Sequence, residues 1–483
     1  MIPAPAVNFA ALAPTLVLLG AAVLVLLLDL FPPRQDKTHI AVVSLAGVIG
    51  ALLIVLTRWG HDQRGFRDMV VLDNYALFVD VVICYAVALV ILLSIDYLRR
   101  EGVQSGEYFA LVLFSASGMM LMASANDLIV VFLALELMSL CLYVLAGLFK
   151  QRLESTEASM KYFLLGAFAS SFLLYGIALT YGATGSTSFD RIAAVAAGPS
   201  GRDHMFLVGL GLMLVGFGFK ISAAPFHMWA PDVYQGAPTS VTTLIATGSK
   251  AAGFAALIRL LLGSLRGIQP DWGPLIWALA VVTMTLGNVV ALAQSNLKRM
   301  LAYSSIAHVG YMLMGLVGGG PQGAGAILFY LLAYTFTTIG AFGAIGLCAR
   351  SGEDAVEVGD FSGLARRHPL LAATLAVFLL SLVGIPPLAG FVSKFYLFGS
   401  AVRAGYVWLT VIAVLNSAVA AYYYLRVIVY MYMREPDGEP VSVAPSLAGG
   451  LALTLAIIGI VVLGLMPAPF ADLAQAAVAP LLR

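Results

Sequence analysis

Four ionisable residues lie inside long apolar segments of the sequence. Glu136 lies in one segment, and Lys220, Lys250 and Lys394 lie in three others. A charge at the centre of a lipid bilayer costs about 2.5 to 3.5 kcal/mol on insertion scales, so each residue needs a partner, water or a function. Burial disfavours the charged form of a lysine, and a nearby carboxylate favours it. The chemistry that this set indicates is proton transfer at membrane depth.

Glu136 and Lys220 are expected to form the first pair. The segment of Glu136 begins at the helix-capping residues Asn126 and Asp127. Glu136 then lies roughly 15 Å along a helix that rises about 1.5 Å per residue, which is close to mid-membrane. A change in its separation from Lys220 would load or unload a proton. The alternative for Glu136 is a structural acid that pairs with a serine or a backbone group.

Lys250 and Lys394 are expected further along the same path. Lys250 lies in TTLIATGSKAAGFAALIRL, where small residues leave room for water. Both ends of this segment are about 12 residues away, too far for the ammonium to snorkel to an interface. Lys394 is expected on the exit side, and its alternative is an ordinary lysine near a helix end.

His308 is a further candidate for the proton path, and His227 and Asp80 are possible accessory residues. His308 lies within an apolar segment, and because histidine titrates near neutral pH, a relay role is favoured over a simple hydrogen bond. His227 is equally expected to face the cavity of Lys220 or to lie outside it. Asp80 is expected to be structural, and the three tyrosines at 422–424 are expected to serve packing.

Proline interrupts two of the apolar segments. Pro225 has no N–H and crowds the preceding turn, so the helix is expected to break immediately after Lys220. Gly384, Pro386 and Pro387 are expected to break a later helix in the same way. Such breaks are tolerated where the backbone lines a wet cavity or is buried in protein. Paired breaks in the two halves of a chain are typical of transporters built from repeats.

Spacing supports the repeat. His308 follows Glu136 by 172 residues, and Lys394 follows Lys220 by 174. These offsets map span 5 onto span 10 and broken span 7 onto broken span 12. A unit of five spans is odd in number, so successive units would have opposite orientations in the membrane.

The whole chain fits a membrane protein. Of its 483 residues 61% are hydrophobic and only 11% are charged, and the mean hydropathy is +0.96. Stretches of about 20 apolar residues, enough to cross a bilayer, recur about fourteen times. Lipid requires every backbone group to be paired within the segment, so these are helices. We therefore expect an all-α polytopic membrane protein with about 14 transmembrane helices and two inverted five-helix repeats, each with a broken helix.

The expected organisation has four parts. Residues 1–105 hold three spans, and residues 106–265 form the first repeat, with spans 4 to 8 and broken span 7. Residues 266–435 form the second repeat, with spans 9 to 13 and broken span 12. Residues 436–483 hold the last span and a short tail.

Charge placement predicts the topology. The N-terminus has no positive n-region and no clear cleavage site, so the first apolar run is expected to remain as a span. By the positive-inside rule the N-terminus is outside, although four arginines, at 64, 67, 202 and 266, lie on that side. The residues expected on the cytoplasmic side are Arg34, Lys37, Arg99, Arg100, Lys150, Arg152, Lys298, Arg299, Arg366, Arg367 and Arg434.

Other features exclude function classes. The net charge of +1 indicates no nucleic-acid partner. Cys84, Cys141 and Cys348 are isolated, which excludes a cysteine-ligated iron-sulfur cluster and a disulfide framework. The glycine-rich stretch at 209–218 lies within a span and follows no strand, so helix packing is favoured over nucleotide binding. No metal-binding or cofactor-binding residues are expected.

Several segments resemble subunit N of the proton-pumping NADH:quinone oxidoreductase, respiratory complex I. They are GEYFALVLFSASGMMLMASANDLIVVFLALELMSLCLYVLAG, STEASMKYFLLGAFASS, PFHMWAPDVYQGAPTSVTTLIATGSKAAGFAALIRL, NLKRMLAYSSIAHVGYMLMG and LVGIPPLAGFVSKFYLF. The broader antiporter-like family, which includes subunits L and M and Mrp-type antiporters, shares the glutamate, the broken helices and the proline-histidine-tryptophan pattern. The lysine at position 394, where the M type has glutamate, and the short C-terminus are similar to the N type.

The resemblance implies a proton path through Glu136, Lys220, Lys250 and Lys394, with Lys250 as the central carrier and Lys394 leading to the outer side. It implies a subunit of an enzyme complex, without a redox centre of its own, in a bacterial plasma membrane. Its partners would be other membrane subunits, the lipid bilayer and protons. FMN, iron-sulfur clusters, NADH and quinone would be bound elsewhere in the complex.

Three alternatives stay open at this point. The nearest is an Mrp-type sodium/proton antiporter subunit or the membrane subunit of an energy-converting hydrogenase, which the residues barely separate from subunit N. A quinone-reducing haem protein would need paired histidines on facing helices, and only His227 and His308 lie deep enough. A purely structural scaffold would carry four buried charges without a task.

Overall fold

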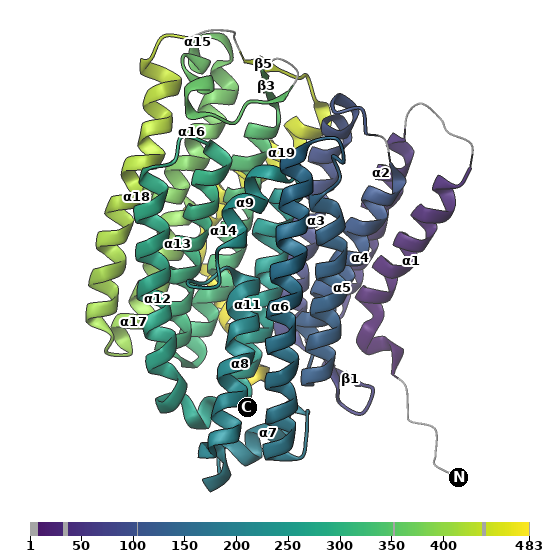
Figure 1. The fold of residues 1–483 in the computed structure, drawn as a ribbon, viewed down its shortest axis with the longest axis vertical. Coiled ribbons are helices and arrows are strands. Elements are labelled where there is room, and N and C mark those ends of the chain that lie inside the picture. The colour runs from purple at the N-terminus through teal and green to yellow at the C-terminus, as the bar shows by residue number, and fades with distance from the viewer. Residues whose placement is uncertain (1–7, 32–36, 104, 351–352, 437–440, 483) are drawn as a thin grey trace.

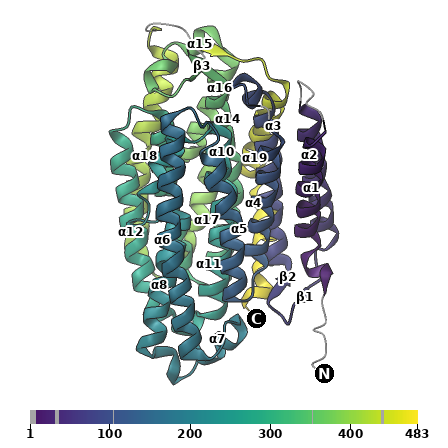
Figure 2. The same ribbon diagram turned by 45° about the vertical axis from the view of Figure 1, so that its right-hand side comes forward.

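The chain folds into a bundle of long helices that lie side by side (Figure 1). This computed structural model describes residues 8–31, 37–103, 105–350, 353–436 and 441–482. Within these residues thirteen helices are long and apolar enough to cross a membrane. The bundle has an α15 end, with the short helix α15 and strand β3, and an α7 end, with α7 and β1 (Figures 1 and 2). The predicted all-α polytopic fold is confirmed.

The first half of the chain contains the following elements. They are η1 (Phe9–Leu12), α1 (Ala13–Asp29), α2 (Thr38–Thr57), β1 (Gln63–Gly65), β2 (Val70–Leu72), α3 (Asn74–Arg100), α4 (Gly106–Ser124), α5 (Leu128–Ala146), α6 (Leu153–Thr184), α7 (Phe189–Ala196), η2 (Pro199–Arg202), α8 (His204–Ile221), α9 (Trp229–Gly236), α10 (Thr239–Leu244), the π-helical η3 (Ile245–Ser249), α11 (Lys250–Ile258) and the π-helical η4 (Arg259–Ser264). Strands β1 and β2 form an antiparallel pair. The last four elements together make one membrane span, Thr239–Ser264.

The second half is also made mainly of helices. Its elements are η5 (Arg266–Ile268), α12 (Gln269–Leu292), α13 (Leu297–Gly318), α14 (Gly320–Gly346), β3 (Cys348–Arg350), β4 (Glu353–Asp354), η6 (Val358–Phe361), α15 (Leu364–Arg367), α16 (Pro369–Val383), α17 (Ala389–Arg403), α18 (Val407–Met433), β5 (Ser442–Val443), α19 (Leu447–Leu465), α20 (Pro467–Val478) and η7 (Ala479–Leu482). The strands form an antiparallel sheet in the order β4-β3-β5. Arg34, on which part of the topology prediction rests, lies outside the described residues.

Both predicted helix breaks are present. Helix α8 ends at Ile221, one residue after Lys220, because Ser222 adopts a left-handed conformation with φ of 64°. Helix α16 ends at Val383, and Gly384 adopts the same conformation with φ of 92°. The twelfth expected span is therefore split into α16 and α17, of 15 residues each. With the thirteen long helices, this split span completes the fourteen expected crossings.

Each half of the chain contains the same pair of backbone hydrogen bonds at the start of one helix. We call this pair of hydrogen bonds a clasp. In the first half, the Leu128 N–H donates to Thr187 and the Phe189 N–H donates to Asn126, at 2.9 and 3.1 Å. In the second half, the N–H groups of residues 297 and 358 donate to the carbonyls of residues 356 and 295, at 2.6 and 2.8 Å. Asp127 and Asn296 cap the two helices with their side chains. All these positions differ by 169 residues.

The clasps lie at opposite ends of the bundle. Thr187 precedes α7, whereas Val356 precedes η6 and α15 (Figure 1). Helices α5 and α13 therefore start at opposite ends, as an inverted repeat requires. The same comparison corrects the residue pairs from which the repeat was predicted. Glu136 corresponds to Ser305 by the clasp, not to His308.

The breaks give a second correction. Ser222 and Gly384 differ by 162 residues, which makes Leu382 the counterpart of Lys220. Lys220 lies before its break, but Lys394 lies after its break, on α17. The offset of 174 between Lys220 and Lys394 therefore does not relate equivalent positions. The two ammonium groups are still similarly placed, because the Lys394 side chain reaches back to the end of α16.

Candidate functional site

Lys220 is held in the core of the first half by hydroxyl groups. It is buried in the last turn of α8, and its Nζ donates to Ser139 Oγ at 3.0 Å and to the Tyr162 hydroxyl at 3.3 Å. The C-terminal end of a helix carries partial negative charge, which favours a cation at this place. Trp229 steadies the break, because its indole N–H donates to the Phe219 carbonyl at 2.9 Å and its ring stacks on Tyr162.

Glu136 lies near Lys220 but does not touch it. The carboxylate of Glu136 accepts a hydrogen bond from Ser170, and no ion pair joins it to Lys220 among the residues that the structure describes. Ser139, Ser170 and Lys220 line one small cavity of about 10 Å³, which is close to the space that one water molecule needs. In place of the direct pair predicted from sequence, Lys220 bonds to Ser139 and Glu136 bonds to Ser170.

Glu136 is half-buried, which differs from the expectation of a buried acid. Its neighbours on the same face of α5, Leu133 and Leu140, are 57% and 52% exposed. This face of α5 lies at the rim of the bundle. Hydrophobicity alone could not separate an inward from an outward glutamate, since α5 is apolar all round.

Lys250 connects the two halves. It is buried at the start of α11, directly after the π-helical turn η3. Its Nζ donates to the carbonyl oxygen of Ser305 at 3.1 Å and also to the Ser305 hydroxyl. Ser305 Oγ in turn lies 2.6 Å from the hydroxyl of Tyr334 on α14. The lysine of the eighth span is thereby linked to α13 and α14 of the second half.

His308 lies one turn further along α13. It is buried, and its Nδ1 lies 2.5 Å from the Tyr330 hydroxyl while its Nε2 lies 3.3 Å from the Tyr424 hydroxyl. Tyr424 also bonds to Ser304. Both ring nitrogens of His308 therefore have hydroxyl partners that can donate or accept, as a proton relay needs.

Sequence reasoning missed these tyrosines. Tyr423 and Tyr424 are buried and hydrogen-bonded, so the prediction that they only pack is wrong, whereas Tyr422 is 62% exposed. A buried tyrosine hydroxyl usually needs a polar partner. The signal that could have found them is the cluster of Ser304, Ser305 and His308 within two turns of α13.

Lys394 binds the end that the break leaves on α16. Its Nζ donates to the carbonyl oxygens of Leu382 and Val383 at 3.0 and 2.8 Å, and to Ser417 Oγ at 2.8 Å. The ammonium also lies 5.3 Å from the centre of the Tyr311 ring. It thus satisfies carbonyls that have no N–H partner within the helix.

A polar bridge lies between His308 and Lys394. Tyr423 donates to Asn288 Oδ1 at 3.0 Å, and Asn288 Nδ2 donates to the Tyr311 hydroxyl at 2.9 Å. Tyr423 is adjacent in sequence to Tyr424, and Tyr311 carries the ring beside Lys394. Hydroxyl and amide groups therefore line the space between the His308 ring and the Lys394 ammonium.

The two accessory candidates, His227 and Asp80, lie apart from the buried groups described above. His227 is half-buried between the exposed residues Pro225 and Met228, and it does not line the cavity of Lys220. Asp80 is buried on α3, and its Oδ1 has no hydrogen-bond partner among the described residues. Seven residues before it, Asp73 forms a buried two-point ion pair with Arg259, with both N to O distances at 2.9 Å.

A polar line runs from the α15 end toward Lys250. Asp354 on β4 accepts hydrogen bonds from Tyr97 at 2.9 Å and from Thr239 Oγ1 at 2.7 Å. Thr243 and Thr247 follow Thr239 at successive turns, each donating to the carbonyl one turn back. A cavity of about 10 Å³ is lined by Tyr97, Thr239 and Thr243.

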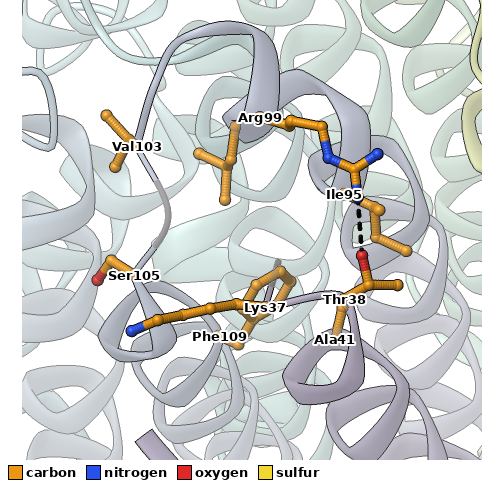
Figure 3. Close-up of a pocket in the computed structure, with 9 residues that line it drawn as sticks. Lys37, Thr38, Ala41, Ile95, Arg99, Val103, Ser105 and Phe109 are labelled. Atoms are coloured by element: carbon orange, nitrogen blue, oxygen red, sulfur yellow. Dashed lines mark hydrogen bonds between the residues drawn. The ribbon is translucent and has the colours of Figure 1, made fainter. Parts of the chain in front are cut away.

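A separate pocket lies at the same end but holds none of these residues. Figure 3 shows Lys37, Arg99 and Ser105 around it, with Arg99 bonded to Thr38 at 3.1 Å. Its volume is only about 20 Å³. Among the described residues, no group of three or more histidine, cysteine or acidic residues could hold a metal ion, and the three cysteines are free and buried.

The sequence matches a known family over most of its length. The family described as NADH:quinone oxidoreductase/Mrp antiporter, TM matches residues 125–420, which hold the clasps, both breaks and Lys220, Lys250 and Lys394. The chain belongs to this family. It is also 49% identical to NADH-quinone oxidoreductase subunit N of Trichlorobacter lovleyi, over 98% of this chain and 97% of that protein. A subunit N of Roseiflexus castenholzii is 45% identical over 95% of this chain and 94% of that protein.

Solved structures give the same result for the fold. A chain of respiratory complex I from Thermus thermophilus is 38% identical, with a TM-score of 0.82 over 96% of this chain and 99% of that chain. A chain of an archaeal membrane-bound sulfane sulfur reductase is 28% identical, with a TM-score of 0.85 over 99% and 98%. A chain of the Mrp complex from Dietzia sp. is 23% identical, with a TM-score of 0.84 over 98% and 97%, and it is similar in fold alone.

Proposed function

We propose that this chain is the N-type membrane subunit of NADH:quinone oxidoreductase and moves protons across the membrane during electron transfer. The observation that carries the proposal is the row of buried lysines, Lys220, Lys250 and Lys394, each held by hydroxyl or carbonyl oxygens. An ammonium held by neutral acceptors can lose its proton without leaving a buried carboxylate behind. Near full-length similarity to subunit N relatives supports the same conclusion.

The path begins at the α15 end. Asp354 and Thr239 would pass a proton toward Thr243 and Thr247, through water that enters the small cavity beside them. Lys250 is the next group along the eighth span. The positive residues Arg99, Arg152 and Arg366 favour the cytoplasm for this end, which puts the N-terminus outside.

The second half completes the path. Ser305 accepts from Lys250 and bonds to Tyr334, and His308 with Tyr330 and Tyr424 would carry the proton further. Tyr423, Asn288 and Tyr311 lead to Lys394, from which the proton leaves on the outer side. The distances between these groups require the intervening space to be hydrated during turnover.

Glu136 and Lys220 would control whether Lys250 carries its proton. When the carboxylate approaches Lys220, the ammonium form of Lys220 is favoured, and repulsion then drives the proton from Lys250. When it withdraws, Lys250 can be reloaded. Gly253, one turn after Lys250, packs beside the stem of Lys220, so the helices that carry the two lysines pack closely there.

The redox chemistry would take place in other subunits, in a bacterial plasma membrane. FMN, iron-sulfur clusters, NADH and quinone would be bound there, and this chain would contribute no redox centre. Its partners would be the neighbouring membrane subunits, lipid and protons. The Mrp-type and hydrogenase alternatives are less favoured, because the full-length relatives at 45 to 49% identity are subunits N.

The test compares matched lysine variants in the assembled complex. NADH oxidation and dye-reported proton uptake would be measured together in inverted membrane vesicles. We expect Lys220→Ala and Lys250→Ala to lose more than half of the proton uptake, and Lys150→Ala, an exposed lysine, to keep it. Lys250→Arg keeps the charge but cannot release a proton, so it should assemble and yet fail to pump. Normal pumping in Lys250→Arg would contradict the proposal.

A further inference from the structure

A large groove lies between α16 and α19, away from the buried lysines. Its volume is about 800 Å³, far more than the small cavities beside Lys220 and Thr239. Its walls are Leu371 and Thr374 on α16 and Leu451 and Ile457 on α19. Apolar residues make most of this lining, so the groove is suited to hydrocarbon.

The mouth of the groove is cationic. Arg367 and His368, where α15 leads into α16, lie at the end of the groove that faces the α15 end. Arg367 is exposed and takes part in none of the ion pairs of the described residues, whereas its neighbour Arg366 pairs with Glu435 at 3.4 Å. A planar guanidinium without a protein partner is well suited to a phosphate group.

The combination is directional. The cation lies at the mouth, and the apolar walls run from there along the short apolar helix α16 and the membrane-spanning helix α19. An amphiphile with an anionic head and hydrocarbon chains has the same arrangement. Basic pockets between transmembrane helices on the cytoplasmic side are a recognised place for anionic lipid head groups.

We propose that this groove is a binding site for one anionic phospholipid. Its phosphate binds Arg367 with help from His368, and an acyl chain lies between α16 and α19. The site is distinct from the proton path but not unrelated to it. The far end of α16 supplies the Leu382 and Val383 carbonyls that hold Lys394, so a lipid that fills the groove also fixes the position of α16.

The test uses the assembled complex in nanodiscs of phosphatidylcholine with a small share of phosphatidylglycerol. Lipid that remains bound after purification is counted by native mass spectrometry. We expect Arg367→Gln to weaken retention of phosphatidylglycerol about tenfold, the loss expected of one hydrogen bond between charged groups. The matched control is Arg403→Gln, an exposed arginine at the α7 end, which should retain the lipid.

A second variant tests the hydrocarbon part. Leu451→Trp fills the groove without removing a charge, and it should also release the lipid while the complex stays assembled. The proposal is overturned if both variants retain phosphatidylglycerol, or if phosphatidylcholine is retained equally well. It is also overturned if inorganic phosphate displaces the lipid from Arg367 without loss of assembly, or if a cross-linker placed at Leu451 labels a neighbouring subunit.

Discussion

Lys250 donates to both oxygens of Ser305, and this contact joins the eighth span to the second half of the bundle. By the clasps at the starts of α5 and α13, Ser305 occupies the place that Glu136 occupies in the first half. One half therefore offers a carboxylate at this place and the other a neutral hydroxyl. A nearby carboxylate favours the charged form of a lysine, so Lys250, whose partner Ser305 is neutral, is better placed than Lys220 to give up its proton.

The Tyr424 hydroxyl should be needed for transfer through the second half. Tyr424→Phe removes the group that bonds to Ser304 and faces His308, so proton uptake per NADH oxidised should fall by more than half. Tyr422→Phe removes an exposed hydroxyl on the same helix and is the matched control. Vesicle assays of both variants decide the matter. Equal pumping in the two would show that Tyr424 only packs.

The start of α17 should tolerate no side chain at Gly390. A Cβ there would lie 1.7 Å from the Ser381 carbonyl oxygen, so Gly390→Ala must push α17 away from α16. Such overpacking costs about 1 to 3 kcal/mol and also displaces the carbonyls that hold Lys394.

Gly399→Ala on the same helix is the control, because its Cβ would meet no atom closer than 4.0 Å. It should stabilise α17 by about 0.5 to 1 kcal/mol, since alanine favours helix over glycine. Thermal stability of the purified complex and its pumping give the two readouts. A stable, active Gly390→Ala variant would disprove the tight contact.

The buried ion pair between Arg259 and Asp73 should be essential for stability. Arg259→Gln leaves the Asp73 carboxylate buried without its cation, which costs about 3 to 5 kcal/mol. The pair of Arg64 and Asp190 is exposed, so Arg64→Gln should cost less than about 1 kcal/mol. Melting of the purified complex, followed by size-exclusion fluorescence, compares them. Similar losses in both variants would contradict the distinction.

Sequence patterns predicted the framework well because membrane insertion imposes it. Long apolar runs had to be helices, Pro225 and Gly384 had to end them, and Asp127 had to cap α5. Lys220, Lys250 and Lys394 were found for the same reason, since a charge within such a run is costly unless a partner, water or a task accompanies it. Lys298 was expected to be a loop charge, but it is buried and donates to the Ala237 carbonyl at 2.7 Å. These inferences use only local rules along the chain.

The relationships between helices could not be predicted in the same way. Lys394 reaches back to carbonyls twelve and eleven residues earlier, and Asn288 meets Tyr423 from a helix far away in the sequence. Both contacts depend on how the helices pack, which hydrophobicity does not encode when a helix is apolar all round. The half-exposed position of Glu136 escaped prediction for the same reason.

The position of Glu136 has a consequence for biogenesis. A newly inserted chain shows the face of Leu133, Glu136 and Leu140 at the rim of α5, where acyl chains cannot solvate a carboxylate. Only another protein surface or trapped water can cover it. A neighbouring membrane subunit that docks on this face of α5 would cover the carboxylate, which a chain without that neighbour leaves at the rim.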